Sequence, residues 1–254
     1  MPCHHVHSAY SIVYILRALT PKEKYATKDL VEVLTMLPII TLKNITLGYE
    51  VASPILLDFS CTIQAGETVH LVGDNGCGKT TLLKLLNGLL LPLQGQYIFQ
   101  GTEVSRKLLH QQSWSKAFHQ KIGYLWQKPE SQLFCSTVEE ELAFGPLQMG
   151  LTKEEIQQRV QDTLELLGIG HLRERTPYTL SGGEQKKTAI GAILTMNPTI
   201  WILDEPMNDL DRQSQSWLID FLTSLKTAGK TIIFTSHHQQ LNQIADKSIT
   251  LGQV

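Results

Sequence analysis

One segment of eight residues constrains this chain more than any other. Residues 73–80 read Gly-Asp-Asn-Gly-Cys-Gly-Lys-Thr, between a short apolar run at 69–72 and a leucine-rich stretch at 79–90. This spacing, after a strand and before a helix, is typical of a loop that binds phosphate. Its glycines let backbone N–H groups approach an anion, and the helix that follows points its positive end at the same place. The segment therefore predicts an α/β domain with a nucleotide site.

The positions of this loop have separate expected roles. Lys79 is expected to reach the β- and γ-phosphates, and the Thr80 hydroxyl is expected to help hold Mg²⁺. Cys77 places a thiol at a helix N-terminus, which predicts a lowered pKa, high reactivity and loss of ATP hydrolysis on alkylation. The expected nucleotide contacts in this part of the chain are Gly73, Asp74, Asn75, Gly76, Cys77, Gly78, Lys79, Thr80 and Thr81.

The composition is that of a globular protein with a core. Hydrophobic residues make up 42% and charged residues 18%, and the net charge of −2 argues against a nucleic-acid partner. The cysteines are scattered without a CxxC pair, which suits a reducing compartment. No stretch approaches the roughly 20 apolar residues that span a bilayer. If the chain works at a membrane, we expect another chain to cross it.

Residues 1–37 differ from the rest and are expected to be an extension. They begin Met-Pro-Cys-His-His-Val-His and lack strand–helix alternation. A metal site is the alternative interpretation, but no second ligand pair has finger-like spacing. Met36 directly precedes the first strand-like run, 39–42, so we hypothesise that the native start is Met36 and that the extension is disordered or non-native. Residues 38–254 are predicted to form one domain.

Several elements of this domain can be predicted from local pattern. Thr152 and Glu155 are spaced as a capping box before a helix over 152–167, and Gly168 is expected to end it. A second helix is predicted over 211–228. The short apolar runs 200–203 and 231–235 are typical of parallel strands covered on both faces.

Further motifs follow the loop in order. Residues 180–185 read Leu-Ser-Gly-Gly-Glu-Gln, and the strand 200–203 runs into Asp204 and Glu205, where open α/β sheets bind ligands. Together these motifs resemble the nucleotide-binding domain of ATP-binding-cassette (ABC) proteins. The resemblance implies a P-loop NTPase with a RecA-like parallel-sheet core, an antiparallel β subdomain and a helical signature subdomain at about 128–180. It also implies ATP and Mg²⁺ as ligands.

The resemblance assigns catalytic roles to four side chains. Asp204 holds Mg²⁺ through water, with Thr80 and Gln127 as further metal contacts, and Gln127 also senses the attacking water. Glu205 is the general base that polarises this water. His237 contacts the γ-phosphate, with His238 as the alternative.

The same resemblance implies that ATP binds between two subunits. The helix that begins at Ser181, here called the signature helix, starts with a hydroxyl and free backbone N–H groups. In this family that helix start caps a γ-phosphate held by the opposite subunit. The plainer interpretation is an N-capped structural helix. Tyr49 is expected to stack on adenine. Residues 207–211 resemble the D-loop of the family, and its last residue, Asp211, also suits a helix N-cap. The signature residues are Ser181, Gly182, Gly183 and Glu184.

The stretch after Gln127 resembles the ATPases of energy-coupling-factor importers, which take up vitamins, cobalt and nickel. Residues 127–134 read Gln-Lys-Pro-Glu-Ser-Gln-Leu-Phe, and an acidic run follows at 139–141. In that family the stretch docks a helix of the transmembrane coupling protein, and we expect the acidic run to pair with arginines there. A favourable interaction with the helix dipole is the alternative.

This second resemblance implies the partners and the location. They are a second ATPase copy, identical or related, the coupling protein and a substrate-binding membrane subunit, at the cytoplasmic face of the membrane. A soluble ABC ATPase that scaffolds iron–sulfur assembly is the alternative, because Gly-Gly-Glu followed by paired lysines fits it too. Asp204-Glu205-Pro206 and residues 132–134 fit that group poorly. A DNA-repair ATPase would need a long insertion between the loop and the signature, and this sequence has none.

Overall fold

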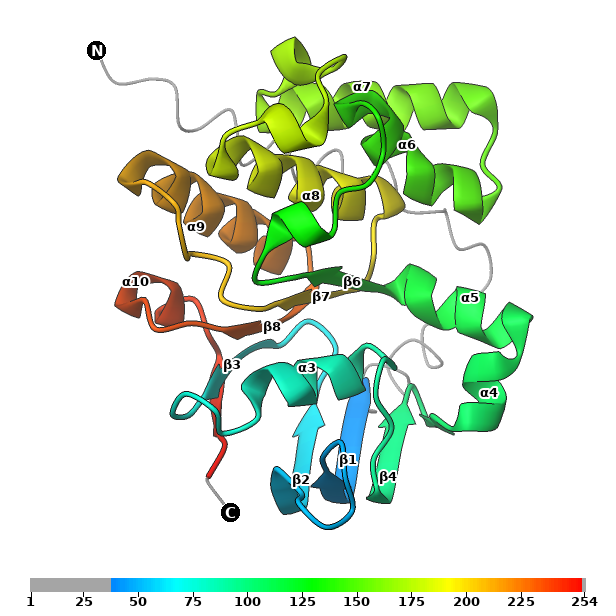
Figure 1. The fold of residues 1–254 in the computed structure, drawn as a ribbon, viewed down its shortest axis with the longest axis vertical. Coiled ribbons are helices and arrows are strands. Elements are labelled where there is room, and N and C mark those ends of the chain that lie inside the picture. The colour runs from blue at the N-terminus through cyan, green and yellow to red at the C-terminus, as the bar shows by residue number, and fades with distance from the viewer. Residues whose placement is uncertain (1–37, 253–254) are drawn as a thin grey trace.

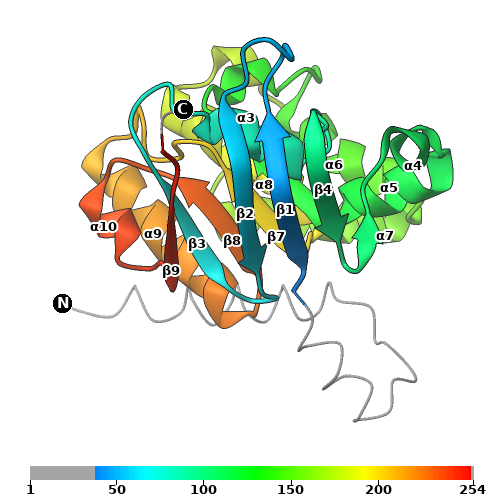
Figure 2. The ribbon, with the colours of Figure 1, turned by 90° about the horizontal axis from the view of Figure 1, so that it is seen from below.

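The computed structural model describes residues 38–252. Its centre is a five-stranded parallel sheet in the order β6-β7-β8-β3-β9. These strands are β6 (Ile122–Leu125), β7 (Ile200–Leu203), β8 (Thr231–Thr235), β3 (Thr68–Val72) and β9 (Lys247–Thr250). A four-stranded antiparallel sheet, β2-β1-β4-β5, lies across helix α3 from the parallel sheet (Figures 1 and 2). Its strands are β1 (Ile40–Leu47), β2 (Leu56–Ile63), β4 (Gln94–Phe99) and β5 (Thr102–Glu103).

Helices cover both faces of the parallel sheet. In Figure 1, α8 and α9 lie on one face with α6 and α7 outside α8, and α3 lies on the other face. The α-helices are α3 (Lys79–Leu86), α4 (Arg106–His110), α5 (Gln112–Lys121), α6 (Val138–Met149), α7 (Lys153–Leu167), α8 (Gly182–Met196), α9 (Arg212–Thr227) and α10 (Gln239–Asn242). Three 3₁₀ turns connect them, at Pro129–Ser131, Gly170–Leu172 and Pro177–Thr179.

β7 is apolar at every position because both of its faces are buried. Along β7, Trp201 and Leu203 belong to the core formed with α6 to α9. Ile200 and Ile202, which point the other way, belong to the core shared with α3 and the antiparallel sheet. The predicted fold class, a parallel-sheet core with an antiparallel sheet and added helices, is confirmed.

Local capping chemistry sets the helix ends. α7 begins at the predicted capping box of Thr152 and Glu155 and ends at Gly168, which has a left-handed φ of 64°. α3 ends at Leu86, so the predicted extension to residue 90 is wrong. Gly88 turns the chain away with φ 71°, and a Cβ there would lie 2.9 Å from the Phe118 ring.

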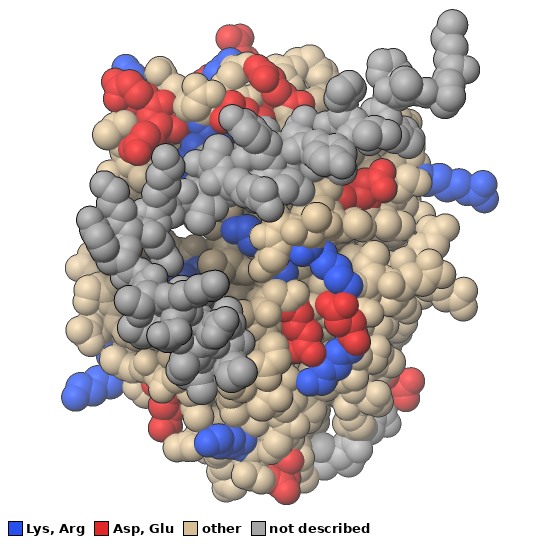
Figure 3. All heavy atoms as spheres, turned by 180° about the vertical axis from the view of Figure 1, so that it is seen from behind, with Lys and Arg blue, Asp and Glu red and all other residues tan. Residues whose placement is uncertain are grey.

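The charged side chains are mixed in sign on the described surface. On the face in Figure 3, Lys and Arg side chains lie among Asp and Glu side chains without a continuous basic patch. Within residues 38–252, no helix has both the length and the apolar character needed to cross a bilayer. The predictions about residues 1–37 lie outside the described part of the chain.

Candidate nucleotide site

The loop between β3 and α3 leaves the first turn of α3 open to a ligand. Gly78 occupies the N-cap position with φ 100°, and no side chain caps the N–H groups of this turn. A Cβ at Gly78 would lie 2.6 Å from the Cγ2 atom of Ile55, so only glycine fits here. Exposed N–H groups at a helix start bind anions.

Lys79 lies folded over this loop. Its Nζ donates to the carbonyl oxygens of Gly73 at 2.7 Å and Asp74 at 2.9 Å. The ammonium group thus lies at the mouth of a cavity of about 210 Å³ at the carboxyl edge of the parallel sheet. The cavity is lined by Asn75, Gly76, Gly78, Lys79, Thr80, Thr81, Gln127, Asp204 and Glu205. The structure therefore brings together most of the predicted loop residues with the predicted catalytic carboxylates.

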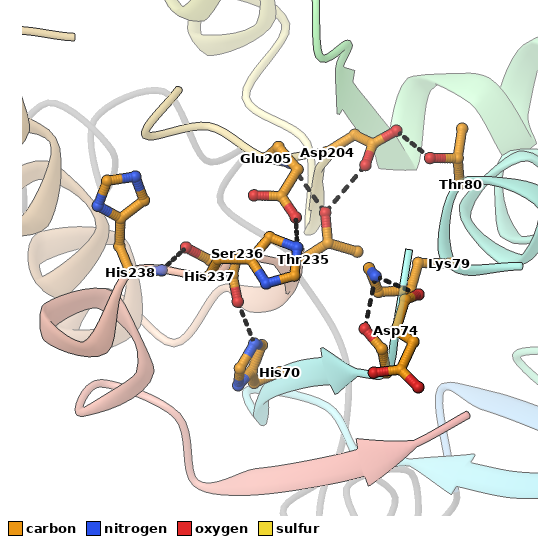
Figure 4. A network of polar contacts seen from close by, with 11 residues as sticks. His70, Asp74, Lys79, Thr80, Asp204, Glu205, Thr235, Ser236, His237 and His238 are labelled. Atoms are coloured by element: carbon orange, nitrogen blue, oxygen red, sulfur yellow. Dashed lines mark hydrogen bonds and ion pairs between the residues drawn. The ribbon is translucent and has the colours of Figure 1, made fainter. Parts of the chain in front are cut away.

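Asp204 is held by two threonine hydroxyls (Figure 4). Thr80 Oγ1 donates to Asp204 Oδ2 at 2.8 Å, and Thr235 Oγ1 donates to Asp204 Oδ1 at 2.9 Å. Thr235, at the end of β8, also accepts from the backbone N–H of Glu205 at 2.8 Å. This buried hydroxyl fixes both acidic residues, and the sequence analysis missed it, because a threonine that ends an apolar strand carries no local signal.

The Glu205 carboxylate is buried, and within the described part of the chain only one of its two oxygens has a partner. The residue is 7% exposed and has a left-handed φ of 46°. Its Oε1 lies 3.5 Å from Nε2 of His237, whereas its buried Oε2 has no partner in the described part of the chain. Glu205 also lines the cavity, so its carboxylate lies where a water or a ligand group could satisfy this buried oxygen. The geometry selects His237 over His238, whose side chain lies away from Glu205 (Figure 4).

The cavity offers the ligands that Mg²⁺ prefers. The Asp204 carboxylate and the Thr80 hydroxyl lie within one hydrogen bond of each other, and the amide of Gln127 lines the same space. Mg²⁺ is bound through one or two carboxylates together with substrate phosphates and waters. The oxygen donors of this cavity fit the ion.

Tyr49 lies apart from the cavity. Its ring is 61% exposed, and Lys84 donates to the hydroxyl at 3.0 Å. The hydrogen bond from Lys84 lowers the pKa of Tyr49 below its ordinary value. An exposed ring held from one side is free to stack on a base.

The signature residues make no part of the cavity lining. Ser181 is the N-cap of α8 and forms a capping box with Glu184. The Glu184 carboxylate accepts from the Ser181 backbone N–H at 2.8 Å and hydroxyl at 2.7 Å, which holds its pKa below the ordinary value. A Cβ added at Gly182 would meet nothing within 4 Å, whereas one at Gly183 would lie 3.3 Å from the hydroxyl oxygen of Ser214. Asp211 caps α9 by accepting from Ser214 N at 2.7 Å, as the capping interpretation predicts.

The burial of Cys77 argues against the high reactivity predicted for its thiol. The residue is 2% exposed, and its Sγ lies under the loop, where a Cβ on Gly73 would come within 2.5 Å. Of the predicted contacts, Gly73, Asp74 and Cys77 do not line the cavity.

The acidic run makes contacts within the protein, and of its three residues Glu141 is too buried to belong to the predicted arginine-binding surface. Glu139 pairs with Arg173 at 3.0 Å, and Glu140 accepts from Ser136 N at 3.1 Å. Glu141, 4% exposed, accepts from the backbone N–H groups that precede α6 at 2.9 and 2.8 Å. The alternative interpretation, helix capping and a favourable dipole, describes these three residues.

Lys186 is a further residue that the sequence analysis missed. It lies on α8, is 3% exposed, and donates to the carbonyl oxygens of Pro206 at 3.0 Å and Asn208 at 2.6 Å. Burial lowers the pKa of its ammonium group. The side chain ties the signature helix to the turn that follows Glu205.

Comparisons with known proteins identify the family of this chain. The ABC transporter family model matches residues 56–208. The nickel import ATP-binding protein LarO of Lactiplantibacillus plantarum is 42% identical over 195 residues, which cover 76% of this chain and 81% of LarO.

Two solved structures share the fold. CbiO1 of Clostridium perfringens, part of the ABC transporter complex CbiONQ, has a TM-score of 0.73 and 31% identity over 84% of both chains. A dimer of the ATP-binding cassette MJ0796 bound to ADP and Pi has a TM-score of 0.75 and 26% identity, covering 84% of this chain and 94% of that one. The chain belongs to the ABC transporter family, as an ATP-binding subunit that hydrolyses ATP.

Proposed function

We propose that this chain powers a membrane importer of the energy-coupling-factor type, and that two ATPase copies bind ATP between them. The supporting observation is the separation of the two predicted phosphate sites within one copy. The cavity beside Lys79 contains the loop and both carboxylates, whereas Ser181 starts a helix that does not line it. A second copy, identical or related, would supply the missing helix start.

In this proposal the chain neutralises the charge of the triphosphate from several sides. Lys79 exchanges its two loop carbonyls for phosphate oxygens, and the N–H groups of the first turn of α3 bind the same anion. The N-terminus of the partner's signature helix adds its own N–H groups and dipole. Mg²⁺, held near Asp204 and Thr80, would neutralise charge on the β- and γ-phosphates.

Glu205 is proposed as the general base. Its unpartnered Oε2 accepts a proton from water, and its other oxygen is already oriented by His237. His237, whose side chain is 59% exposed, is free to contact the γ-phosphate of ATP. Gln127 lines the cavity, and in this proposal a change in what the cavity holds moves Gln127 and the segment that follows it. Loss of the γ-phosphate removes the bridge between copies, and the dimer opens.

A groove beyond Gln127 supports a membrane partner. It has a volume of about 410 Å³ and runs between α5, α6 and α8. Phe134, 66% exposed, packs edge-on against Phe144 with ring centroids 4.9 Å apart in its wall. We propose that an apolar helix segment of the transmembrane coupling protein occupies it, which would place the chain at the cytoplasmic face of the membrane.

The nickel-import relative and the CbiONQ subunit favour a metal-ion or vitamin importer over an iron–sulfur scaffold. The test is purification of the full chain from its native cells in mild detergent, with the integral membrane proteins that accompany it identified by mass spectrometry. The Phe134→Asp variant is expected to lose these partners, whereas Leu57→Asp, an exposed apolar residue on β2, keeps them. A chain that purifies without membrane proteins, or a Phe134→Asp variant that retains them, would remove the importer or the groove from the proposal.

A further inference from the structure

A second histidine lies behind the contact between Glu205 and His237. His70, on β3, is only 5% exposed. The parallel register of β3 and β8 places it opposite Phe234, and the two rings stack with centroids 4.9 Å apart and an interplanar angle of 9°. This packing holds the imidazole of His70, on the strand that leads into the phosphate-binding loop, against Phe234, on the strand that leads to His237.

His70 bonds the backbone directly before His237. Its Nε2 lies 3.0 Å from the carbonyl oxygen of Ser236 (Figure 4). A carbonyl oxygen only accepts, so Nε2 must carry the hydrogen. Burial lowers the pKa of His70 below its ordinary value, which keeps the ring neutral near pH 7.

The bonded carbonyl belongs to the peptide group that joins Ser236 to His237. This group is planar, so fixing its oxygen fixes the plane from which the His237 residue continues. Lys79, Glu205 and His237 are the charged or titratable groups that act on His70. His70 itself does not line the phosphate cavity, and its hydrogen bond to this peptide group is its direct contact with the segment that carries His237.

We propose that His70 is a positioning residue: its Nε2–H holds the Ser236 carbonyl and thereby keeps His237 Nε2 3.5 Å from Glu205 Oε1. The inference rests on the proposed role of His237 at the γ-phosphate. The proposal adds a residue on β3, the strand that leads into the phosphate-binding loop. His70 thus couples this loop to His237 across the neighbouring strands β3 and β8.

The test removes only the donor. His70→Phe keeps a buried ring that can stack on Phe234, and is expected to lower kcat roughly tenfold to a hundredfold with little change in KM for ATP. His70→Gln carries an amide N–H near the same place and is expected to restore most of this loss. His110→Ala, which removes an exposed histidine on α4 away from this contact, is the matched control with wild-type kcat.

A double-mutant cycle with His237→Ala distinguishes a failure of the positioning role of His70 from a failure of the proposed role of His237. If His70 acts through His237, His70→Phe adds no further loss to His237→Ala, measured by single turnover of labelled ATP. Additive losses, or a His70→Phe single variant with wild-type kcat, would overturn the positioning role. A His237→Ala variant with full activity would instead refute the proposed role of His237. His70→Leu provides a second donor-free variant should His70→Phe fail to fold.

Discussion

Glu205 Oε1 lies 3.5 Å from His237 Nε2. The two residues follow adjacent strands, Glu205 two positions after β7 and His237 two positions after β8. Among residues 38–252, the second carboxylate oxygen of Glu205 is buried without a hydrogen-bond partner. One oxygen is therefore oriented by His237, and the other lacks a protein partner in a residue that lines the cavity. The proposed roles of Glu205 as the general base and of His237 as a γ-phosphate contact depend on this arrangement.

Glu205→Gln should bind ATP without hydrolysing it at an appreciable rate. The amide keeps the shape of the side chain but cannot accept a proton, so we expect kcat to fall by about 10²–10⁴-fold. Because the γ-phosphate bridge then persists, ATP should produce a stable dimer, measured by size-exclusion chromatography with light scattering. Vigorous hydrolysis by this variant would remove Glu205 from its role.

Thr235→Val should damage both stability and turnover. Valine has nearly the shape of threonine, but it leaves Asp204 Oδ1 and the Glu205 N–H without their shared partner. We expect a loss of about 1–3 kcal/mol in the free energy of unfolding, measured in urea, together with a lower kcat. Thr223→Val removes a hydroxyl from the exposed face of α9 and serves as the control, with a change within about 0.5 kcal/mol. Equal effects of the two substitutions would contradict the special role of Thr235.

Cys77 should react slowly with maleimide in the folded protein. Its thiol is 2% exposed, so the reagent reaches it only when the phosphate loop opens. Once attached, the added group cannot fit beneath Gly73, and ATPase activity should fall in proportion to the labelled fraction measured by mass spectrometry. Mg-ATP should slow the labelling, and Cys77→Ser should stay active throughout. Undiminished turnover after complete labelling would refute this account.

Lys230 makes stability rise with pH. Burial lowers the pKa of this lysine from 10.5 to about 8, while its ammonium group donates to Asn197 Oδ1 at 2.6 Å. Between about pH 8 and pH 10.5 the unfolded chain therefore binds more protons than the folded one, which favours folding as pH increases. The destabilisation is fully present below pH 8.

The matched variant for this effect is Lys230→Met. The wild type should gain up to about 1–3 kcal/mol in unfolding free energy relative to this variant as pH rises from about 8 to 10. Denaturant titrations of both proteins across this range measure the difference. A constant difference between them would contradict the lowered pKa.

The parts of the fold that the sequence predicted depend on local chemistry. β7 and β8 have the predicted bounds because a short, largely apolar run is typical of a strand buried on both faces. α7 has its predicted start and end because a capping box and a left-handed glycine are local devices. α3 ends before residue 90 because the chain turns at Gly88, whose φ is 71°, a local stop signal that the prediction overlooked.

The parts of the site that the sequence analysis missed depend on distant partners. Thr235 contacts Asp204 and Glu205, which lie 31 and 30 positions away, and His70 contacts Ser236 across 166 positions. Neither side chain belongs to a spaced motif. Glu141 failed as a surface acid for a different reason: the segment just before α6 folds over it, and N–H groups seven and six positions away supply its hydrogen bonds.

The most direct test of the account is a crystal structure of the Glu205→Gln protein grown with Mg-ATP. The account predicts two copies and two nucleotides, each with its γ-phosphate within hydrogen-bond distance of Lys79 Nζ from one copy and of Ser181 Oγ from the other. A structure in which Lys79 and Ser181 contact different ligands, or in which ATP fills the cavity of a lone monomer, would contradict it.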